Sequence, residues 1–573
     1  MPVFLPVAEL SINALWLIGA GGAVGFLSGL LGVGGGFLLT PILMMIGIPP
    51  TVAAASDTNA IVATSSSGVA AHFRLGNVDI KMGSILLLGG LTGAAIGVEI
   101  IKVLRALGNA DVLIKLAYIF VLGSVGGLMF FDGIRNLRGG KMMAKAAKQR
   151  KPNPLLAKLP FQMYFPRSRV QHSVFVPFVL CAFVGILAAI MGVGGGFLMV
   201  PMMVYLLRMP AHVAVGTDLF QILFTCAGVT YMQATTNHTV DLLLALLLAA
   251  GSTIGAQFGA LASKLLRGDQ LMIILAALVL LVVGNIGFGL VMAPDSLLQP
   301  AGGHDAPVAR SANEPVAARA EPPPGTGSVN VEPRRIEIGA GYSGVPMRIS
   351  GIAPEGTRVV VVARGPDTEE VFDRKGRKGP IWITTGRVHV AGVPSLFMRY
   401  APEPVDRFLP RSEIERYQLD PAAIKNQLHM KPEDPEEDRL REDYIRLKLD
   451  QRVYRVIDGG LETGQAGGSG RPYSVELHWP RKAPPANYEI RVLECRDGSV
   501  VNTVTSPVEV IKVGFPAALS SLLYSKAPLY GAIAVVIAVI AGFGIDFLAA
   551  GLRRRLMGGA PAGAHTHGAH GGH

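Results

Sequence analysis

The chain has 573 residues, of which 50% are hydrophobic and only 16% are charged, with 70 glycines. This balance is more apolar than a soluble multidomain protein of this size tolerates, so the composition excludes an ordinary soluble enzyme and predicts a membrane protein. The net charge of +11 does not indicate nucleic-acid binding, because ten Lys and Arg residues and no acid lie in 135–171, between two apolar blocks, which is typical of a cytoplasmic loop beside a membrane.

The first predicted elements belong to an internal duplication. Residues 25–41 read GFLSGLLGVGGGFLLTP, and residues 185–201 read GILAAIMGVGGGFLMVP, at an offset of 160 residues. The similarity continues, after one-residue shifts, from VAAASD at 52–57 to VAVGTD at 213–218. Self-similarity at a fixed offset predicts two related structural units. The two predicted transmembrane repeats are 12–133 and 174–293.

Each repeat opens with an apolar stretch that a Gly-Val-Gly-Gly-Gly motif interrupts, at 32–36 and at 192–196. The piece after the motif has about ten residues, and at about 1.5 Å per residue it reaches only about halfway across the membrane. We therefore expect a broken helix or a re-entrant hairpin in place of two ordinary spans. Three fuller helices should follow in each repeat, at 51–72, 81–101 and 111–133 and at 212–233, 240–262 and 271–293.

The loop charges favour one orientation of the repeats. If the broken segment returns to its starting side, each repeat crosses the membrane an odd number of times and the repeats are inverted. With the basic loop 134–173 in the cytoplasm, this topology also places Lys264, Arg267 and the basic cluster 553–555 inside, as the cytoplasmic enrichment of Lys and Arg requires. A single crossing would place these charges outside, so we expect inverted repeats.

The composition changes after the second repeat. Residues 294–327 are rich in Pro, Ala, Gly and Glu and predict a flexible linker. Alternating apolar and polar segments within 328–525 predict a soluble, antiparallel β-sandwich-like domain, which the inverted topology places outside the cytoplasm. An apolar stretch at 528–552 predicts a final transmembrane helix, and 553–573 a cytoplasmic tail rich in His and Gly. The predicted fold class is thus an all-α polytopic membrane protein with broken helices, joined to a β-rich domain.

Glycines of both motifs are candidate ligands. Glycine permits positive φ and lets backbone N–H groups approach a ligand, and a half-helix that begins at the motif would aim its positive end at the membrane interior, where an anion could accept those donors. The alternative is tight helix packing through small residues. The candidate residues are Gly34, Gly35, Gly36, Gly194, Gly195 and Gly196.

Asp57 and Asp218 are matched acids in otherwise apolar helices. An ionisable group at that depth is costly and is therefore a candidate for function. Polar neighbours share the same helix faces by spacings of three, four and seven, and one of the two acids could carry a coupling proton. The alternative is an Asp near the membrane edge that caps a neighbouring helix. The further candidates for a transport path are Ser56, Asn59, Thr217, Gln221 and Gln257.

Motifs of other function classes do not stand out. The motif at 32–36 lacks the Gly-Lys-Ser/Thr ending of a phosphate-binding P-loop, and the β-rich domain offers no Ser/His/Asp or metal-ligand constellation. The three cysteines follow no disulfide or metal-binding pattern. We therefore predict no cofactor, no metal site, no nucleic-acid partner and no enzyme activity, which leaves secondary transport.

The paired Gly-Val-Gly-Gly-Gly-Phe-Leu motifs, followed by Pro41 or Pro201 and then by Ala-Ala-Ser-Asp-Thr or Ala-Val-Gly-Thr-Asp, resemble the TauE/SafE family of sulfite exporters over about 12–293. The resemblance implies a multi-pass permease of the bacterial inner membrane, coupled to a proton or another cation, that moves sulfite, sulfoacetate or a related organosulfonate. It leaves the substrate, the direction, the coupling ion and the oligomeric state open.

The segment after residue 293 resembles an alphaproteobacterial family of single-span membrane proteins of unknown function. A fusion of two such parts implies that the β-rich domain works with the transporter, as a periplasmic binding or gating module. The alternative is a membrane-anchored sensor or assembly factor, in which the β-rich domain recognises a partner and the helices support it.

Overall fold

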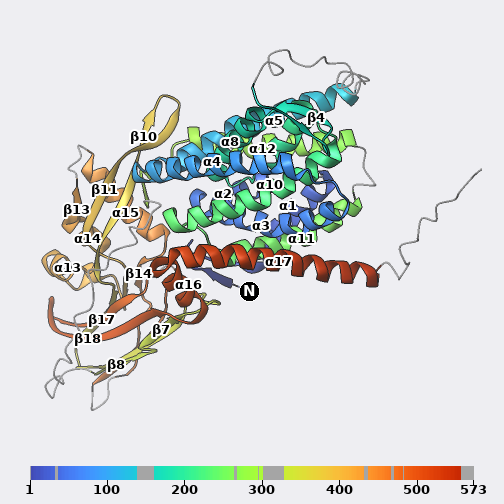
Figure 1. The fold of residues 1–573 in the computed structure, drawn as a ribbon. Coiled ribbons are helices and arrows are strands. Elements are labelled where there is room, and N and C mark those ends of the chain that lie inside the picture. The colour runs from blue at the N-terminus through green and yellow to red at the C-terminus, as the bar shows by residue number, and fades with distance from the viewer. Residues whose placement is uncertain are drawn as a thin grey trace, which may run out of the picture.

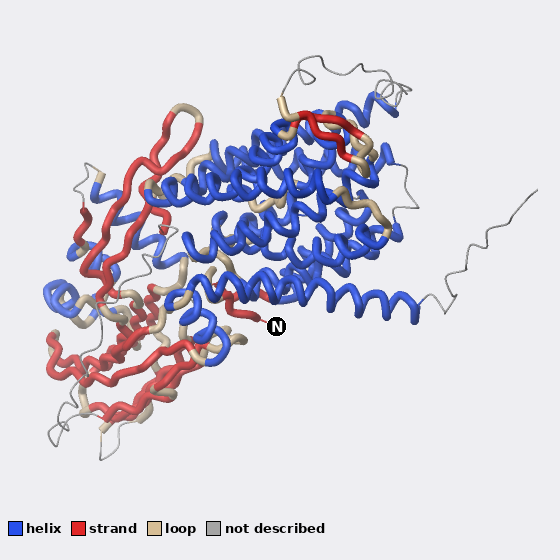
Figure 2. Tube along the Cα trace, in the orientation of Figure 1, coloured by secondary structure: helices blue, strands red, loops and turns tan. Residues whose placement is uncertain are grey.

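The computed structural model describes residues 2–8, 10–31, 36–137, 160–262, 268–294, 296–300, 328–431, 436–465, 470–481 and 483–556. Most of its helices form one bundle. Most strands, together with the helices between 411 and 450, form a second part at one end of that bundle, which we call the β-body, residues 298–300 and 328–512 (Figures 1 and 2). Gly34 and Gly35, most of the basic loop, most of the linker and the His-rich tail from 557 lie outside the described residues.

The helices begin and end close to the residues expected from the sequence. The first repeat contains α1 (Ala14–Leu31), α2 (Gly36–Met45), α3 (Pro50–Arg74), α4 (Ile80–Ala106) and α5 (Ala110–Leu137). The second contains α8 (Phe175–Met191), α9 (Gly196–Tyr205), α10 (Ala211–Met232) with a π-helical extension (Gln233–Asn237), α11 (Leu242–Ala262) and α12 (Gly268–Val291), and α17 (Ala527–Leu556) closes the chain. Helices α4, α5, α10, α11 and α17 are long and apolar enough to cross a membrane. The structure thus confirms a multi-pass helical region.

A short β-hairpin precedes each repeat. The first pairs β1 (Pro2–Leu5) with β2 (Leu10–Asn13), and the second pairs β3 (Gln162–Phe165) with β4 (Val170–Ser173). The two hairpins keep the 160-residue offset, with FLPVAEL at 4–10 against YFPRSRV at 164–170, so the duplication begins earlier than residues 12 and 174. They lie at opposite ends of the bundle, since the N-terminus is beside the β-body and β4 is at the far end (Figure 1).

The glycine motif of the second repeat breaks the helix as expected. Gly192 has a left-handed φ of 74° and donates its N–H to Ala188 O at 2.8 Å, which ends α8. Gly195 has a φ of 81° and precedes α9. The chain then returns to its starting end, because His172 Nε2 in β4, just before α8, lies 2.9 Å from Leu207 O, just after α9. Helices α8 and α9 therefore form a re-entrant pair with the glycines at its tip.

Small residues let the two repeats exchange helices. Helix α1 packs against α11 of the second repeat, and a Cβ atom on Gly25 would lie 2.1 Å from Ser252 O. Helix α8 packs against α4 of the first repeat, and a Cβ atom on Gly185 would lie 2.3 Å from Gly90 O. Only glycine permits backbones to approach this closely. The first helix of each repeat is thus buried against the fourth helix of the other.

Equivalent helices of the two repeats run antiparallel where they meet. Helix α5 packs against its counterpart α12, with Gly126 against Val279 and Gly123 against Val283. The residue number falls on one helix as it rises on the other. Helices α5 and α12 therefore run in opposite directions.

The β-body has one hydrophobic core beneath three sheets. Its sheet orders are β14-β12-β9-β17-β18-β7, β15-β16-β8-β6 and β13-β11-β10-β5. The strands are β5 (Leu298–Pro300), β6 (Ser328–Glu332), β7 (Arg335–Ile338), β8 (Pro346–Ala353), β9 (Arg358–Arg364), β10 (Asp367–Lys378), β11 (Ile381–Pro394), β12 (Phe397–Ala401), β13 (His429–Lys431), β14 (Tyr454–Asp458), β15 (Glu462–Thr463), β16 (Arg471–His478), β17 (Ala486–Arg496) and β18 (Ser499–Lys512).

The expectation of a purely antiparallel sandwich is corrected, because β12 pairs with β14 in parallel and β18 with β7 in parallel. A parallel pair needs a crossover. For β12 and β14 the crossover carries the helices α13 (Arg411–Tyr417), α14 (Pro421–Gln427) and α15 (Glu437–Asp450).

The C-terminal part of the chain is fastened to the bundle. In the β-body, Ala340 O accepts from Phe4 N at 2.9 Å and Tyr342 O accepts from Ser11 Oγ at 2.9 Å, so it holds the first hairpin. After α16 (Gly514–Ser525), helix α17 packs along α3, where a Cβ atom on Gly542 would lie 1.9 Å from Ala63 O. The final helix is therefore packed into the bundle.

Candidate functional site

A cavity of about 300 Å³ lies within the bundle and is lined by residues of both repeats. This volume is at the lower end of the range for small-molecule pockets, roughly 300–1,000 Å³. The two predicted acids, Asp57 and Asp218, both line it, as do Gly36 and Gly196. The polar lining is completed by Ser28, Thr64, Ser65 and Ser252.

The two short helices begin at the cavity. Gly36 is the first residue of α2 and Gly196 the first residue of α9. A helix N-terminus carries partial positive charge, so both helices present that charge to the cavity. A Cβ atom on Gly36 would lie 2.3 Å from Ile61 Cδ1, so a larger residue would force this contact apart. Gly194 and Gly195 shape the turn before α9 and are not part of the described lining.

Asp57 is 1% exposed, and only one of its two carboxyl oxygens accepts a hydrogen bond from a described residue. Its Oδ2 accepts a hydrogen bond from Thr40 Oγ1 of α2 at 2.8 Å, whereas Oδ1 has no partner within the described parts of the chain. Nearby, the hydroxyl of Tyr118 donates to Met191 O at 2.5 Å, at the end of α8. The carboxyl group of Asp57 is thus bonded to α2.

Asp218 is 3% exposed and lies in a more apolar setting. Its Oδ1 has no hydrogen-bond partner among the residues that the structure describes. Val200 occupies the position equivalent to Thr40, at the 160-residue offset, and cannot donate a hydrogen bond. The two acids therefore differ, because a hydroxyl of α2 binds one and the matching residue of α9 offers the other no donor.

The other predicted residues lie near the cavity but do not line its described surface. Ser56 Oγ accepts from Asp241 N at 2.9 Å, and Thr217 Oγ1 accepts from Asp79 N at 3.0 Å. Gln221 Nε2 donates to Thr225 Oγ1 at 2.9 Å. Asn59 is fully buried, and its amide atoms have no partner in the described structure; the same is true of Gln257 Nε2.

Sequence reasoning missed the cavity serines. Ser28 lies three residues after Gly25 in the glycine-rich α1, and Ser252 lies one residue after Gly251 in α11. A hydroxyl within a stripe of small residues was the available signal. Both sit where α1 and α11 meet, a pairing that the sequence did not reveal.

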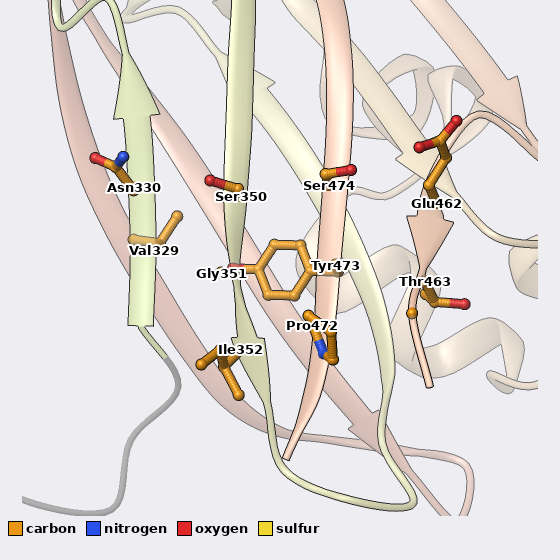
Figure 3. A pocket seen from close by; sticks show the side chains of 11 residues that line it. Val329, Asn330, Ser350, Gly351, Ile352, Glu462, Thr463, Pro472, Tyr473 and Ser474 are labelled. Carbon is orange, nitrogen blue, oxygen red and sulfur yellow. The ribbon is translucent and has the colours of Figure 1, made fainter. Parts of the chain in front are cut away.

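A second, open pocket of about 670 Å³ lies on the β-body. Figure 3 shows Asn330, Ser350, Ser474 and Glu462 in a row across four strands, which follows from the strand register. The pocket combines these polar groups with Tyr473. Its described lining has no basic side chain and no helix N-terminus, so neither attracts an anion there.

Two duplicated helical halves around a buried polar cavity define the class, a multi-pass membrane transporter. Residues 17–286 match the family model "Sulfite exporter TauE/SafE", and residues 328–550 match "Putative transmembrane protein (Alph_Pro_TM)". The helical repeats thus match the TauE/SafE family model, and the region after them matches the Alph_Pro_TM model. Both resemblances expected from the sequence are confirmed.

Relatives cover the helical part. The chain is 28% identical over 264 residues to the probable membrane transporter protein YjnA of Bacillus subtilis, which is 45% of this chain and 93% of that protein. It is 26% identical over 275 residues to YunE of the same organism, which is 46% of this chain and 94% of that protein. Sulfite exporter TauE/SafE family protein 3 of Arabidopsis thaliana is 33% identical over 120 residues, 20% of this chain and 24% of that protein. No solved structure gives a significant match.

Proposed function

We propose that the protein is a secondary transporter that exports a small sulfur-containing anion, sulfite, sulfoacetate or a related organosulfonate, across the bacterial inner membrane. The main support for this proposal is that two helix N-termini and two buried carboxyl groups line the same cavity. Helix dipoles supply the attraction for an anion without a fixed cationic side chain. The substrate class and the direction rest on the description of the family that matches residues 17–286.

The repeats are inverted in this proposal, and the β-body is periplasmic. The antiparallel pairing of α5 with α12 and the re-entrant pair α8–α9 support the inversion. Charge supports the orientation. Helix α17, whose last residues include the basic cluster 553–555, ends away from the β-body (Figure 1). Arg74 ends α3 two residues before Gly76, whose carbonyl oxygen accepts a hydrogen bond from Arg167 in the turn between β3 and β4. Cytoplasmic enrichment of basic residues then places the β-body outside.

A coupling proton resolves the conflict between an anion and two acids. Carboxylates in a low-dielectric cavity repel an anion strongly, so at least one acid must be neutral when the anion is bound. Asp218 is the better proton carrier, because Thr40 already donates to Asp57 and favours its ionised form. In the second repeat, Val200 takes the place of Thr40 and offers Asp218 no hydroxyl donor. The proton thus resides on Asp218 during anion binding.

Proteoliposomes that contain the purified protein and labelled sulfite test this function. Wild type should carry sulfite faster under an imposed proton gradient, and Asp218→Asn should remove the dependence on the gradient. Asp57→Asn should lower flux roughly tenfold or more, since a charge-assisted hydrogen bond is worth about 1.5–3 kcal/mol. Glu99→Gln is the matched control, because Glu99 is exposed and pairs with Lys102.

Flux of sulfite, sulfoacetate and other organosulfonates equal to that of empty liposomes would refute transport of this substrate class. It would favour the alternative, a membrane-anchored sensor or assembly factor that acts through the β-body. Wild-type flux that ignores the proton gradient would refute the role of Asp218.

A further inference from the structure

Two buried aspartates outside the cavity occupy equivalent places in the two repeats. Asp79 precedes α4 and is 2% exposed, and Asp241 precedes α11 and is 0% exposed. They are 162 residues apart, close to the offset of the duplication. Each caps its helix through one oxygen: Asp79 Oδ1 accepts from Met82 N at 3.1 Å, and Asp241 Oδ1 accepts from Leu244 N at 3.1 Å.

The second oxygen of each aspartate holds a β-hairpin. Asp79 Oδ2 accepts from Ser168 N at 3.0 Å and from Ser168 Oγ at 2.6 Å, in the turn between β3 and β4. Asp241 Oδ2 accepts from Val7 N at 2.9 Å and from Ala8 N at 3.4 Å, in the turn between β1 and β2. A helix cap requires one acceptor, so helix capping alone does not account for these bonds. The bonds also cross between repeats, because each hairpin precedes the repeat that does not contain its aspartate.

Each aspartate is also hydrogen-bonded to the residue that precedes a cavity acid. The backbone N–H of Asp241 donates to Ser56 Oγ, and Ser56 is the residue before Asp57. The backbone N–H of Asp79 donates to Thr217 Oγ1, and Thr217 is the residue before Asp218. The same chain of contacts, hairpin turn to aspartate to hydroxyl to cavity acid, thus occurs at each end of the bundle.

The hairpins close the ends of the bundle. Phe165 of the second hairpin is fully buried among Met203 and Leu207 at the end of the α8–α9 pair, and Leu5 of the first is fully buried in the core that includes Leu43 of α2. The first hairpin is also held by the β-body, through the bonds to Ala340 and Tyr342 described above. One end of the bundle is therefore mechanically joined to the β-body.

We propose that the two β-hairpins are paired gates and that Asp79 and Asp241 are positioning residues that fasten each gate beside the cavity acid at its own end. This inference rests on the proposed transport function for its purpose. Access from one end requires release of the hairpin at that end, while the other stays fastened. The β-body, which grips the first hairpin, acts on the gate at its own end.

Accessibility of a cavity cysteine tests the gates without transport. Ser28→Cys places a thiol in the cavity lining, and the parent protein, whose three cysteines are buried, gives the background. A membrane-impermeant thiol reagent is applied from either side of oriented membrane vesicles. Asp241→Asn should increase labelling from the β-body side, and Asp79→Asn from the opposite side, each about fivefold, which corresponds to about 1 kcal/mol.

Asparagine caps a helix about as well as aspartate, so both variants keep their folds, and an unchanged melting temperature confirms this. Ser168→Ala is a graded variant that removes one of the two donors to Asp79, and it should give a smaller increase on the same side as Asp79→Asn. Ala8, at the equivalent position, already lacks the hydroxyl.

Unchanged labelling in both aspartate variants, or an equal increase from both sides, would refute the proposal that the hairpins are gates. If each variant increases labelling from one side only, but the protein moves no sulfite, the gate proposal is supported and sulfite is refuted as the substrate. Failure of the gate proposal and failure of the proposed substrate therefore give different results.

Discussion

Gly192 at the tip of the α8–α9 pair provides the sharpest test of the helix break. Its φ of 74° is left-handed, and a Cβ atom there would lie 2.3 Å from Ala54 O and 2.5 Å from Ala54 Cα. A left-handed alanine costs about 1–2 kcal/mol, and overpacking against a backbone that cannot rotate away costs about 1–3 kcal/mol. Gly192→Ala should therefore destabilise the bundle by about 2–5 kcal/mol.

Thermal unfolding in detergent measures this loss. At roughly 2–4 °C per kcal/mol for a domain of about this size, the melting temperature should fall by about 4 °C or more. Gly289→Ala is the control, because Gly289 is inside α12 and a Cβ there meets nothing within 4 Å among the described residues; it should be neutral or stabilise by about 0.5–1 kcal/mol. Equal melting of Gly192→Ala and wild type would refute the left-handed tip.

Three further outcomes follow from contacts of the C-terminal part. Gly542→Leu should displace α17 from α3 and lower both the melting temperature and sulfite flux, whereas Gly544→Leu, which faces open space in the described structure, should change neither. Burial raises the pKa of the Cys495 thiol to about 12. An impermeant maleimide at neutral pH should therefore label Cys495 only after unfolding. Rapid labelling of the folded protein would contradict the burial of Cys495 in the β-body core. Burial also raises the pKa of Asp373, which Arg387 partly offsets, so the stability contributed by this carboxyl falls as pH rises through its folded-state pKa. Arg387→Ala should make the melting temperature fall more steeply with pH than in wild type. Parallel profiles of melting temperature against pH for the variant and wild type would contradict this prediction.

The helices could be predicted because their signals are local. Apolar lengths and glycine interruptions determine where a helix begins and ends, and the break at 192–196 occurs as expected. The hairpins could not be predicted, because four-residue strands carry little periodicity, and the turns share mainly Pro6 and Pro166 between apolar positions. Parallel pairing of β12 with β14 depends on a crossover of more than fifty residues, which no local pattern reports.

The cavity was predicted in part for a similar reason. Asp57 and Asp218 line it, but their neighbours Ser56 and Thr217 do not. Successive residues on a helix point about 100° apart, so a residue beside a lining residue faces another helix. Which face looks inward depends on how the repeats exchange helices, and this becomes visible only in three dimensions.

That exchange sets a limit on how the two halves can exist. Helix α1 is covered by α11, and α4 is covered by α8. A chain cut after α5 would therefore expose to lipid the glycine-lined faces of α1 and α4, where the backbone is accessible. If the repeats are inverted as proposed, such a half would have to associate with a second copy inserted in the opposite orientation to cover these glycines. The linked halves of this chain therefore provide, in one polypeptide, an assembly that separate copies could form only with dual topology.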